Sequence, residues 1–147
     1  MIVPIWNKAA LGSNMSGYNL FVKTNNPAFD AQGQLADPGS LHFSQGPLQL
    51  PYHMTVKPND VNPQIIDVTW TNQLSKTVYD EDSLMAVFYS GETFTDPLDT
   101  GFKRRDEQLQ IPFPYDSEPD PYIYLFFYNQ KQEIYSNDQV FCLMVST

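Results

Sequence analysis

From Leu48 onward the chain consists of short apolar and β-branched runs separated by clusters of turn-forming residues, such as "KPNDVNP" and "PYDSEPDP". This spacing predicts short strands rather than helices. We expect strands at 48–57, 64–71, 83–90, 107–113, 121–128 and 133–145, with a weaker one near 92–95; the run 133–145 is either continuous or broken near Asn137. Seven short strands within about 100 residues are typical of a β-sandwich.

Two of the expected strands alternate strictly between apolar and polar residues. In "IIDVTWT", Ile66, Val68 and Trp70 share one face, and the opposite face is polar. "QLQIPFP" alternates in the same way. Strict alternation is typical of an antiparallel strand with one face on the core and one face in water. These two strands therefore belong to a sheet whose outer face is wet.

Three other strands are apolar on both faces: "LMAVFY", "YIYLFFY" and "VFCLMV". In an immunoglobulin-type sandwich they share the C-F-G sheet, so the outer face of that sheet needs a cover. The N-terminal segment is the cover we favour, and another subunit or partial exposure of the tyrosine-rich strands are the alternatives. The segment supplies Ile5, Trp6, Leu11, Tyr18, Leu20, Phe21 and Phe29.

The first 45 residues differ from the rest. Pro4 and Gly12 bracket a short helix at 4–11, and the stretch after Ser16, "GYNLFVK", fits a second helix or a strand. Residues 24–47 are rich in Gly, Pro, Asn and Asp, which predicts a loop with one short strand at Leu41–Phe43. We therefore expect a helical and loop segment at 1–45 that packs on a sandwich at 46–147.

Charge restricts the partners. The chain has 17 acidic and 8 basic residues and a net charge of −9, which disfavours nucleic acid and anionic lipid surfaces. No apolar stretch is long enough for a membrane span, which needs about 20 residues. The single cysteine, Cys142, lies in an apolar run and is predicted to be a buried, inert thiol.

Catalytic motifs are absent from the sequence. The two histidines, His42 and His53, lie in no recognisable motif, and there is no nucleophile elbow, phosphate-binding loop or Cys/His metal spacing. We expect a protein that is not an enzyme and has no cofactor.

Calcium is the metal to consider, because oxygen ligands are plentiful. Residues 80–82 are three successive acids, and Asp116, Glu118 and Asp120 form a second trio, but the two groups are expected at opposite ends of the sandwich. Lys103, Arg104 and Arg105 are expected beside residues 80–82, where charge pairing competes with a metal ion. Calcium binding is possible in this arrangement but is not favoured.

Two resemblances rest on particular residues. A tryptophan on the second strand (Trp70) and the tyrosines of "YIYLFFY" resemble a fibronectin type III domain over residues 46–147, which implies a fold and no activity. The whole chain, especially "SGYNLFVKTN", "VTWTN" and "DEDSLMAVFY", resembles the C-terminal part of a family of uncharacterised Bacteroidota proteins with a domain of unknown function. That resemblance implies lineage, and a further N-terminal region in longer members.

The fold prediction is thus mainly β: a seven-stranded immunoglobulin/fibronectin III-like sandwich with a short N-terminal helical segment. The functional hypothesis is a non-enzymatic structural or interaction module, an assembly component of a virion or cell surface, with a protein partner or self-association. The alternative is a monomeric carbohydrate- or protein-binding module. Loops carry recognition in such folds, and the candidate interaction residues are Tyr79, Asp80, Glu81, Asp82, Asn129, Gln130, Lys131 and Gln132.

Overall fold

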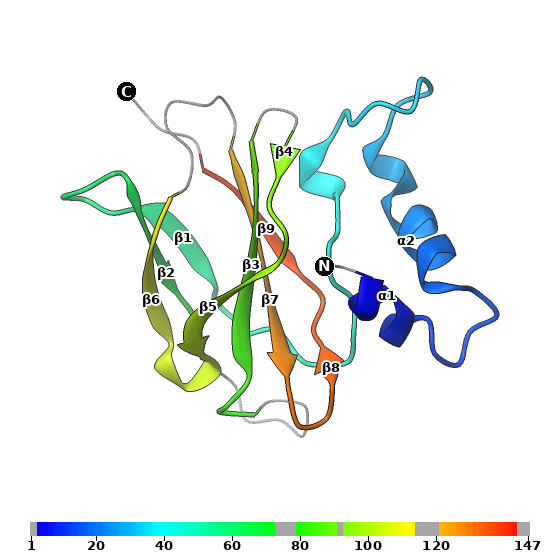
Figure 1. The fold of residues 1–147 in the computed structure, drawn as a ribbon. Helices are drawn as coiled ribbons and strands as arrows, with labels where there is room; N and C mark the ends of the chain where they lie inside the picture. The colour runs from blue at the N-terminus through cyan, green and yellow to red at the C-terminus, as the bar shows by residue number, and fades with distance from the viewer. Residues whose placement is uncertain (1–2, 73–78, 91–92, 114–120, 144–147) are drawn as a thin grey trace.

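The computed structural model, which describes residues 3–72, 79–90, 93–113 and 121–143, contains two antiparallel sheets packed face to face (Figure 1). The smaller sheet has the order β1-β2-β6, formed by Thr55–Pro58, Ile65–Thr69 and Gln108–Pro112. The larger sheet is built on β3 (Ser83–Ser90) and β7 (Tyr122–Asn129). Strands β4 (Thr93–Phe94) and β5 (Leu98–Lys103) pair with β3, and β8 (Ile134–Tyr135) and β9 (Gln139–Cys142) pair with β7.

This strand order confirms the predicted fold class. In fibronectin-type notation the small sheet is A-B-E, and the large sheet is C′-C-F-G with both edge strands split in two. The weak strand near 92–95 exists as β4, and the last strand is broken near Asn137. Residues 144–145 and the trio Asp116, Glu118 and Asp120 lie outside the described residues.

Two strand predictions were wrong, and one strand was missed. The strand expected at 48–57 is confined to Thr55–Pro58; Pro47 and Pro51 have no N–H to donate to a ladder. No strand exists at Leu41–Phe43. Strand β5 was missed because Asp99, Thr100 and Gly101 are typical turn residues, and Gly101 indeed has a positive φ of 83° within this exposed edge strand.

The core has two layers, as the strand patterns predicted. Between the sheets, Val68, Trp70 and Leu109 of the alternating strands pack against Leu84 and Phe127. On the outer face of the large sheet, a second cluster joins both long strands to the N-terminal segment; its buried members are Ile5, Trp6, Ala28, Leu41, Phe43, Val87, Tyr89, Tyr124 and Phe126. The opposite surface, outside β1-β2-β6, is polar.

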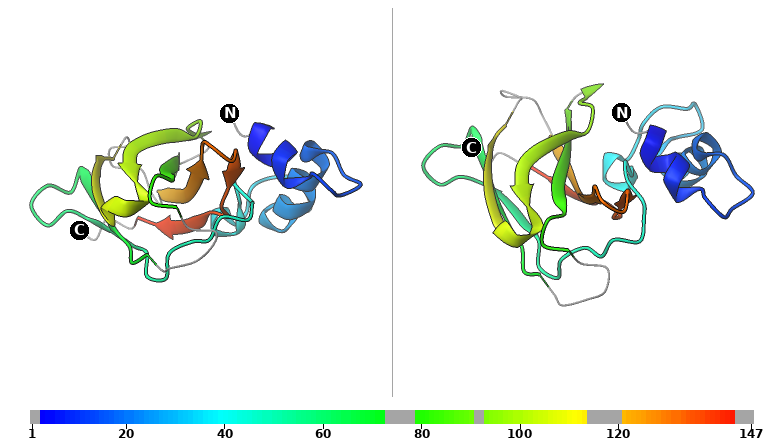
Figure 2. Two further views of the ribbon diagram at one scale, coloured as in Figure 1. Left: turned by 90° about the horizontal axis from the view of Figure 1, so that it is seen from below. Right: turned by 60° about the horizontal axis from the view of Figure 1, so that its bottom comes forward.

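The N-terminal segment lies against the large sheet, on the side away from the small one (Figures 1 and 2). It comprises α1 (Val3–Ala9), α2 (Gly17–Asn25) and the single 3-10 turns η1 (Asn26–Ala28) and η2 (Pro38–Ser40). Ser16 begins α2 because its hydroxyl accepts the Asn19 N–H at 3.1 Å, so the helical alternative is correct. Gly17 permits the close approach of α1, since a Cβ there would lie 2.7 Å from the Asn7 backbone nitrogen. The exact division at residue 45 stays a prediction.

The backbone of residues 41–44 hydrogen-bonds to side chains instead of to a neighbouring strand. Asn25 Oδ1 accepts a hydrogen bond from the His42 N–H at 2.6 Å, and Asn25 Nδ2 donates one to the His42 carbonyl at 2.9 Å. The Phe43 N–H donates to Asp138 at 2.7 Å, and the Phe43 carbonyl accepts from Trp6 Nε1 at 3.1 Å. Because side chains already satisfy this backbone, it forms no sheet ladder.

The register of β7 with its partners shifts by one residue between β8 and β9: Tyr128 lies opposite Tyr135, but Leu125 lies opposite Gln139. One extra residue in a strand is a β-bulge, which redirects a side chain. Here the side chain of Asp138, at the bulge, accepts a hydrogen bond from the Phe43 N–H of the N-terminal segment.

Cys142 corrects another prediction, because it is exposed rather than buried. It lies opposite Tyr122 near the end of β9, on the face that carries the outer cluster, but it does not belong to that cluster. Among the described residues, no helix is both long and apolar enough to cross a membrane.

Candidate functional site

The two predicted recognition loops meet at one end of the sandwich. Gln132 Nε2 donates to the Tyr79 hydroxyl at 3.2 Å, and Asn129 Nδ2 donates to Asp82 Oδ1 at 2.8 Å. The loop after β5 joins them, since the Arg104 N–H donates to the Asp82 carbonyl at 2.8 Å. The predicted neighbourhood of residues 80–82 and 103–105 is therefore correct; residues 73–78 of the first loop lie outside the described part of the chain.

Asp82 holds this end together and is fully buried. Its Oδ2 accepts from Arg104 Nε at 2.9 Å and from the Tyr79 N–H at 3.2 Å, while Oδ1 accepts from Asn129. All three donors point at one carboxylate, so its charge is compensated inside the protein. The sequence placed Asp82 among the candidate interaction residues, but its side chain is buried beneath the loops.

Arg104 is the buried counter-ion, and none of its side chain is exposed. Its guanidinium carbon lies 4.1 Å from the centroid of the Phe127 ring, a cation–π contact. Burial lowers the pKa of Arg104, and the hydrogen bond and charge of Asp82 act in the opposite direction. Its carbonyl accepts from Trp70 Nε1 at 2.9 Å, so this hydrogen bond connects the core tryptophan to the residue that forms the ion pair.

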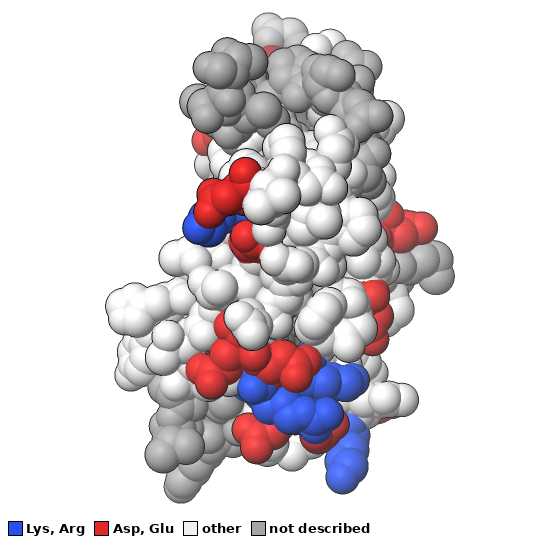
Figure 3. Space-filling model, turned by 90° about the vertical axis from the view of Figure 1, so that its left-hand side faces the viewer, with Lys and Arg blue, Asp and Glu red and all other residues white. Residues whose placement is uncertain are grey.

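Six of the eight predicted recognition residues remain accessible at this end. Asp82 and Asn129 are buried and form the support beneath the loops. Asp80, Glu81, Gln130, Lys131 and Gln132 are exposed, and Tyr79 is half-buried. Arg105 forms an ion pair with Glu81 above the buried pair. Figure 3 shows basic side chains gathered in one patch with acidic side chains beside it, so the charge of this surface is mixed.

Metal binding has no built site among the described residues: no three His, Cys, Asp or Glu side chains are grouped to hold an ion. Asp82 is already occupied by hydrogen-bond donors, which leaves Asp80 and Glu81. Calcium remains a less favoured prediction.

A polar pocket of about 290 Å³ surrounds His42 and Asp138. His42 Nδ1 lies 2.8 Å from Asp138 Oδ1, and this hydrogen bond raises the pKa of His42 despite partial burial. A histidine oriented by a carboxylate is part of hydrolase triads, but the neighbouring Ser44 hydroxyl donates to the Ser136 carbonyl at 2.6 Å. Because the Ser44 hydroxyl is already engaged, we assign the His42–Asp138 pair a structural role: it links the N-terminal segment to the bulge after β8. His53 is exposed beside Tyr52.

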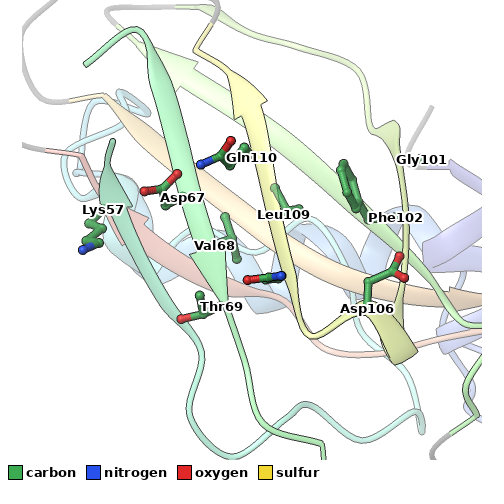
Figure 4. Close-up of a pocket in the computed structure, with 10 residues that line it drawn as sticks. Lys57, Asp67, Val68, Thr69, Gly101, Phe102, Asp106, Leu109 and Gln110 are labelled. Atoms are coloured by element: carbon green, nitrogen blue, oxygen red, sulfur yellow. The ribbon is translucent and has the colours of Figure 1, made fainter. Parts of the chain in front are cut away.

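A wide groove of about 890 Å³ runs over the edge strand β6. Figure 4 shows Phe102 and Asp106 on one side of β6 and Asp67 and Lys57 on the other. Its charges already have partners: Asp67 accepts from Asn59 Nδ2 at 3.1 Å, and Asp106 accepts the Lys103 N–H at 2.7 Å. We therefore assign no ligand to this groove.

An aromatic pocket of about 430 Å³ lies where the N-terminal segment meets the β3–β4 edge. Sequence analysis missed it, because aromatic residues far apart in the chain are expected in any core. The only signal was the high aromatic content of 14%. The residues that line it are Phe21, Phe29, Gln34, Leu35, Leu41, Phe43, Tyr89 and Phe94.

No family model and no curated protein match the chain. The structure is similar to the solution structure of the third fibronectin III domain of the human KIAA0343 protein, with a TM-score of 0.47 and 14% sequence identity over 69% of this chain and 86% of that one. Our fold assignment rests on the strand order described above.

Proposed function

We propose that this protein is a non-enzymatic interaction module whose loop end, formed by residues 79–82, 103–105 and 129–132, contacts a protein partner in a larger assembly. The observation that carries the proposal is the buried Asp82–Arg104–Asn129 network, which fixes three loops from distant parts of the chain beneath one accessible surface. Recognition surfaces gain affinity when they are held in place before binding.

The chemistry of the exposed layer suits a polar protein contact. Glu81 and Arg105 form a pair of opposite sign at the surface, and Lys131 lies in the facing loop with two exposed glutamines. Mixed charge favours a partner of complementary pattern and sets orientation more than raw affinity. We propose that the larger assembly is a virion or a cell-surface structure, of which this protein is one component.

Self-assembly is the first test, since a second copy is the partner at hand. Light scattering and electron micrographs across a concentration series should give regular oligomers. The variant Glu81→Ala/Lys131→Ala should be monomeric with an unchanged melting temperature, and Lys23→Ala on α2 is the matched control far from the loops. A wild-type protein that stays monomeric at every concentration would remove self-assembly through this surface.

A monomeric carbohydrate- or protein-binding module is the second candidate. Its support is that the outer apolar face is packed against the protein's own N-terminal segment, so that face needs no second copy to cover it. Binding to a glycan array by a monomeric protein would favour this candidate over an assembly component.

A further inference from the structure

The aromatic pocket contains five rings from two parts of the chain: Phe21, Phe29 and Phe43 from the N-terminal segment, and Tyr89 and Phe94 from the β3–β4 hairpin. Phe29 is 40% exposed and Phe94 is 54% exposed. Phe43 is buried, and its ring centroid lies 5.3 Å from that of Phe94 at an interplanar angle of 55°. The rings are therefore inclined walls around a space rather than one flat stack.

Neighbouring contacts hold the inner rings in place. Trp6 packs edge-on against Phe21 with centroids 5.2 Å apart, and Tyr124 packs edge-on against Phe43 at 4.7 Å. The Phe43 backbone is anchored at both N–H and carbonyl by Asp138 and Trp6. A pocket supported in this way is preorganised, so a ligand need not order its walls.

The two chain segments that form the pocket contain more carboxylates than lysines. Among the described residues that line it none is charged. The described residues of the two segments that form it, 21–43 and 89–96, include the carboxylates Asp30, Asp37 and Asp96 and the single lysine Lys23. The whole chain carries −9. A cation is therefore attracted to this region, and an anion is repelled.

The aromatic side chains that line the pocket favour one class of cation. Aromatic faces carry negative electrostatic potential and attract alkylated ammonium groups, which are apolar enough to enter a cage without strong hydrogen bonds. A free sugar would require several polar partners, and among the described lining residues only Gln34 and Tyr89 have polar side chains. We propose that this pocket binds a methylated or alkylated ammonium group by cation–π contact. The inference concerns a different surface from the loop end and is independent of it.

Choline and its neutral carbon analogue 3,3-dimethyl-1-butanol have nearly the same shape, so the pair tests the proposal directly. Both are titrated into the full chain and followed by NMR shifts of the aromatic side chains. We expect choline to bind at least about twofold more tightly than the alcohol, the lower end of the range for one exposed cation–π contact. Equal binding of the two would show a merely apolar pocket and overturn the proposal, as would shifts from neither.

Two variants locate the site. Phe94→Leu and Phe29→Leu keep an apolar side chain and remove a ring, so each should weaken choline binding about two- to fivefold and leave binding of the alcohol nearly unchanged. Tyr52→Leu, an exposed ring (67% exposed) outside the pocket, is the matched control and should have no effect. Because all three rings are exposed, the variants should fold; circular dichroism checks this. Choline binding that survives the loss of both rings would contradict the assignment.

Discussion

The buried Asp82–Arg104 pair makes the sharpest prediction about stability. Changing Asp82→Asn preserves the size of the side chain but leaves the Arg104 charge in the interior without a counter-ion. It also replaces a carboxylate oxygen by an NH₂ group, although all three partners of Asp82 are donors. Removing one member of a buried pair costs about 3–5 kcal/mol, and one lost hydrogen bond adds to this. We therefore expect Asp82→Asn to lower the free energy of unfolding by about 4 kcal/mol.

Urea unfolding, followed by tryptophan fluorescence, measures this loss. Trp70 is a suitable reporter because its indole N–H bonds the Arg104 carbonyl. The matched control is Glu81→Gln, which breaks the exposed pair with Arg105 and should cost about 0–1 kcal/mol. The double variant Asp82→Asn/Arg104→Gln should be less destabilised than the sum of its single variants, with a coupling of about 2 kcal/mol. If Asp82→Asn costs no more than Glu81→Gln, water reaches the pair and our account of this end is wrong.

Three further predictions concern the junction of the N-terminal segment with the sheet. Because Asp138 raises the pKa of His42 in the folded state, the contact stabilises the fold fully below the unfolded pKa of about 6.5 and is lost as the pH rises through the folded pKa. His42→Gln should therefore reduce the unfolding free energy more at pH 5.5 than at pH 8.5, by about 1 kcal/mol or less for a half-exposed ring; an equal effect at both pH values would contradict this. Trp6→Ala should cost about 3–5 kcal/mol and increase dye binding and light scattering, because the outer face loses its largest covering side chain; an unchanged, monomeric variant would show that the face needs no cover. The exposed thiol of Cys142 should react with a thiol reagent in the native protein as fast as in urea, whereas a protected thiol would restore the original prediction of burial.

Periodicity predicted the layers of this fold correctly. Strict alternation in "IIDVTWT" gave one wet face, and its absence in "LMAVFY" gave a sheet with two covered faces. Such patterns succeed because burial on each side of a strand acts residue by residue along the chain. Strand β5 escaped detection because an exposed edge strand needs no apolar face: its partner β3 supplies the hydrogen bonds, while Asp99 and Gly101 remain in solvent.

The candidate site was harder to predict because its determining contacts link distant residues. Asp82 meets Arg104 over a separation of 22 residues, and Asp138 meets His42 over 96. In the sequence, Asp80, Glu81 and Asp82 are three equivalent acids; only the fold separates one buried support from two accessible charges. A carboxylate that already accepts from three donors has little capacity left for a metal ion. Of the acids that first suggested a ligand, Asp82 instead joins three loops through buried hydrogen bonds. The ligand site that we propose is lined by aromatic rings such as Phe29 and Phe94, which composition alone would assign to the core.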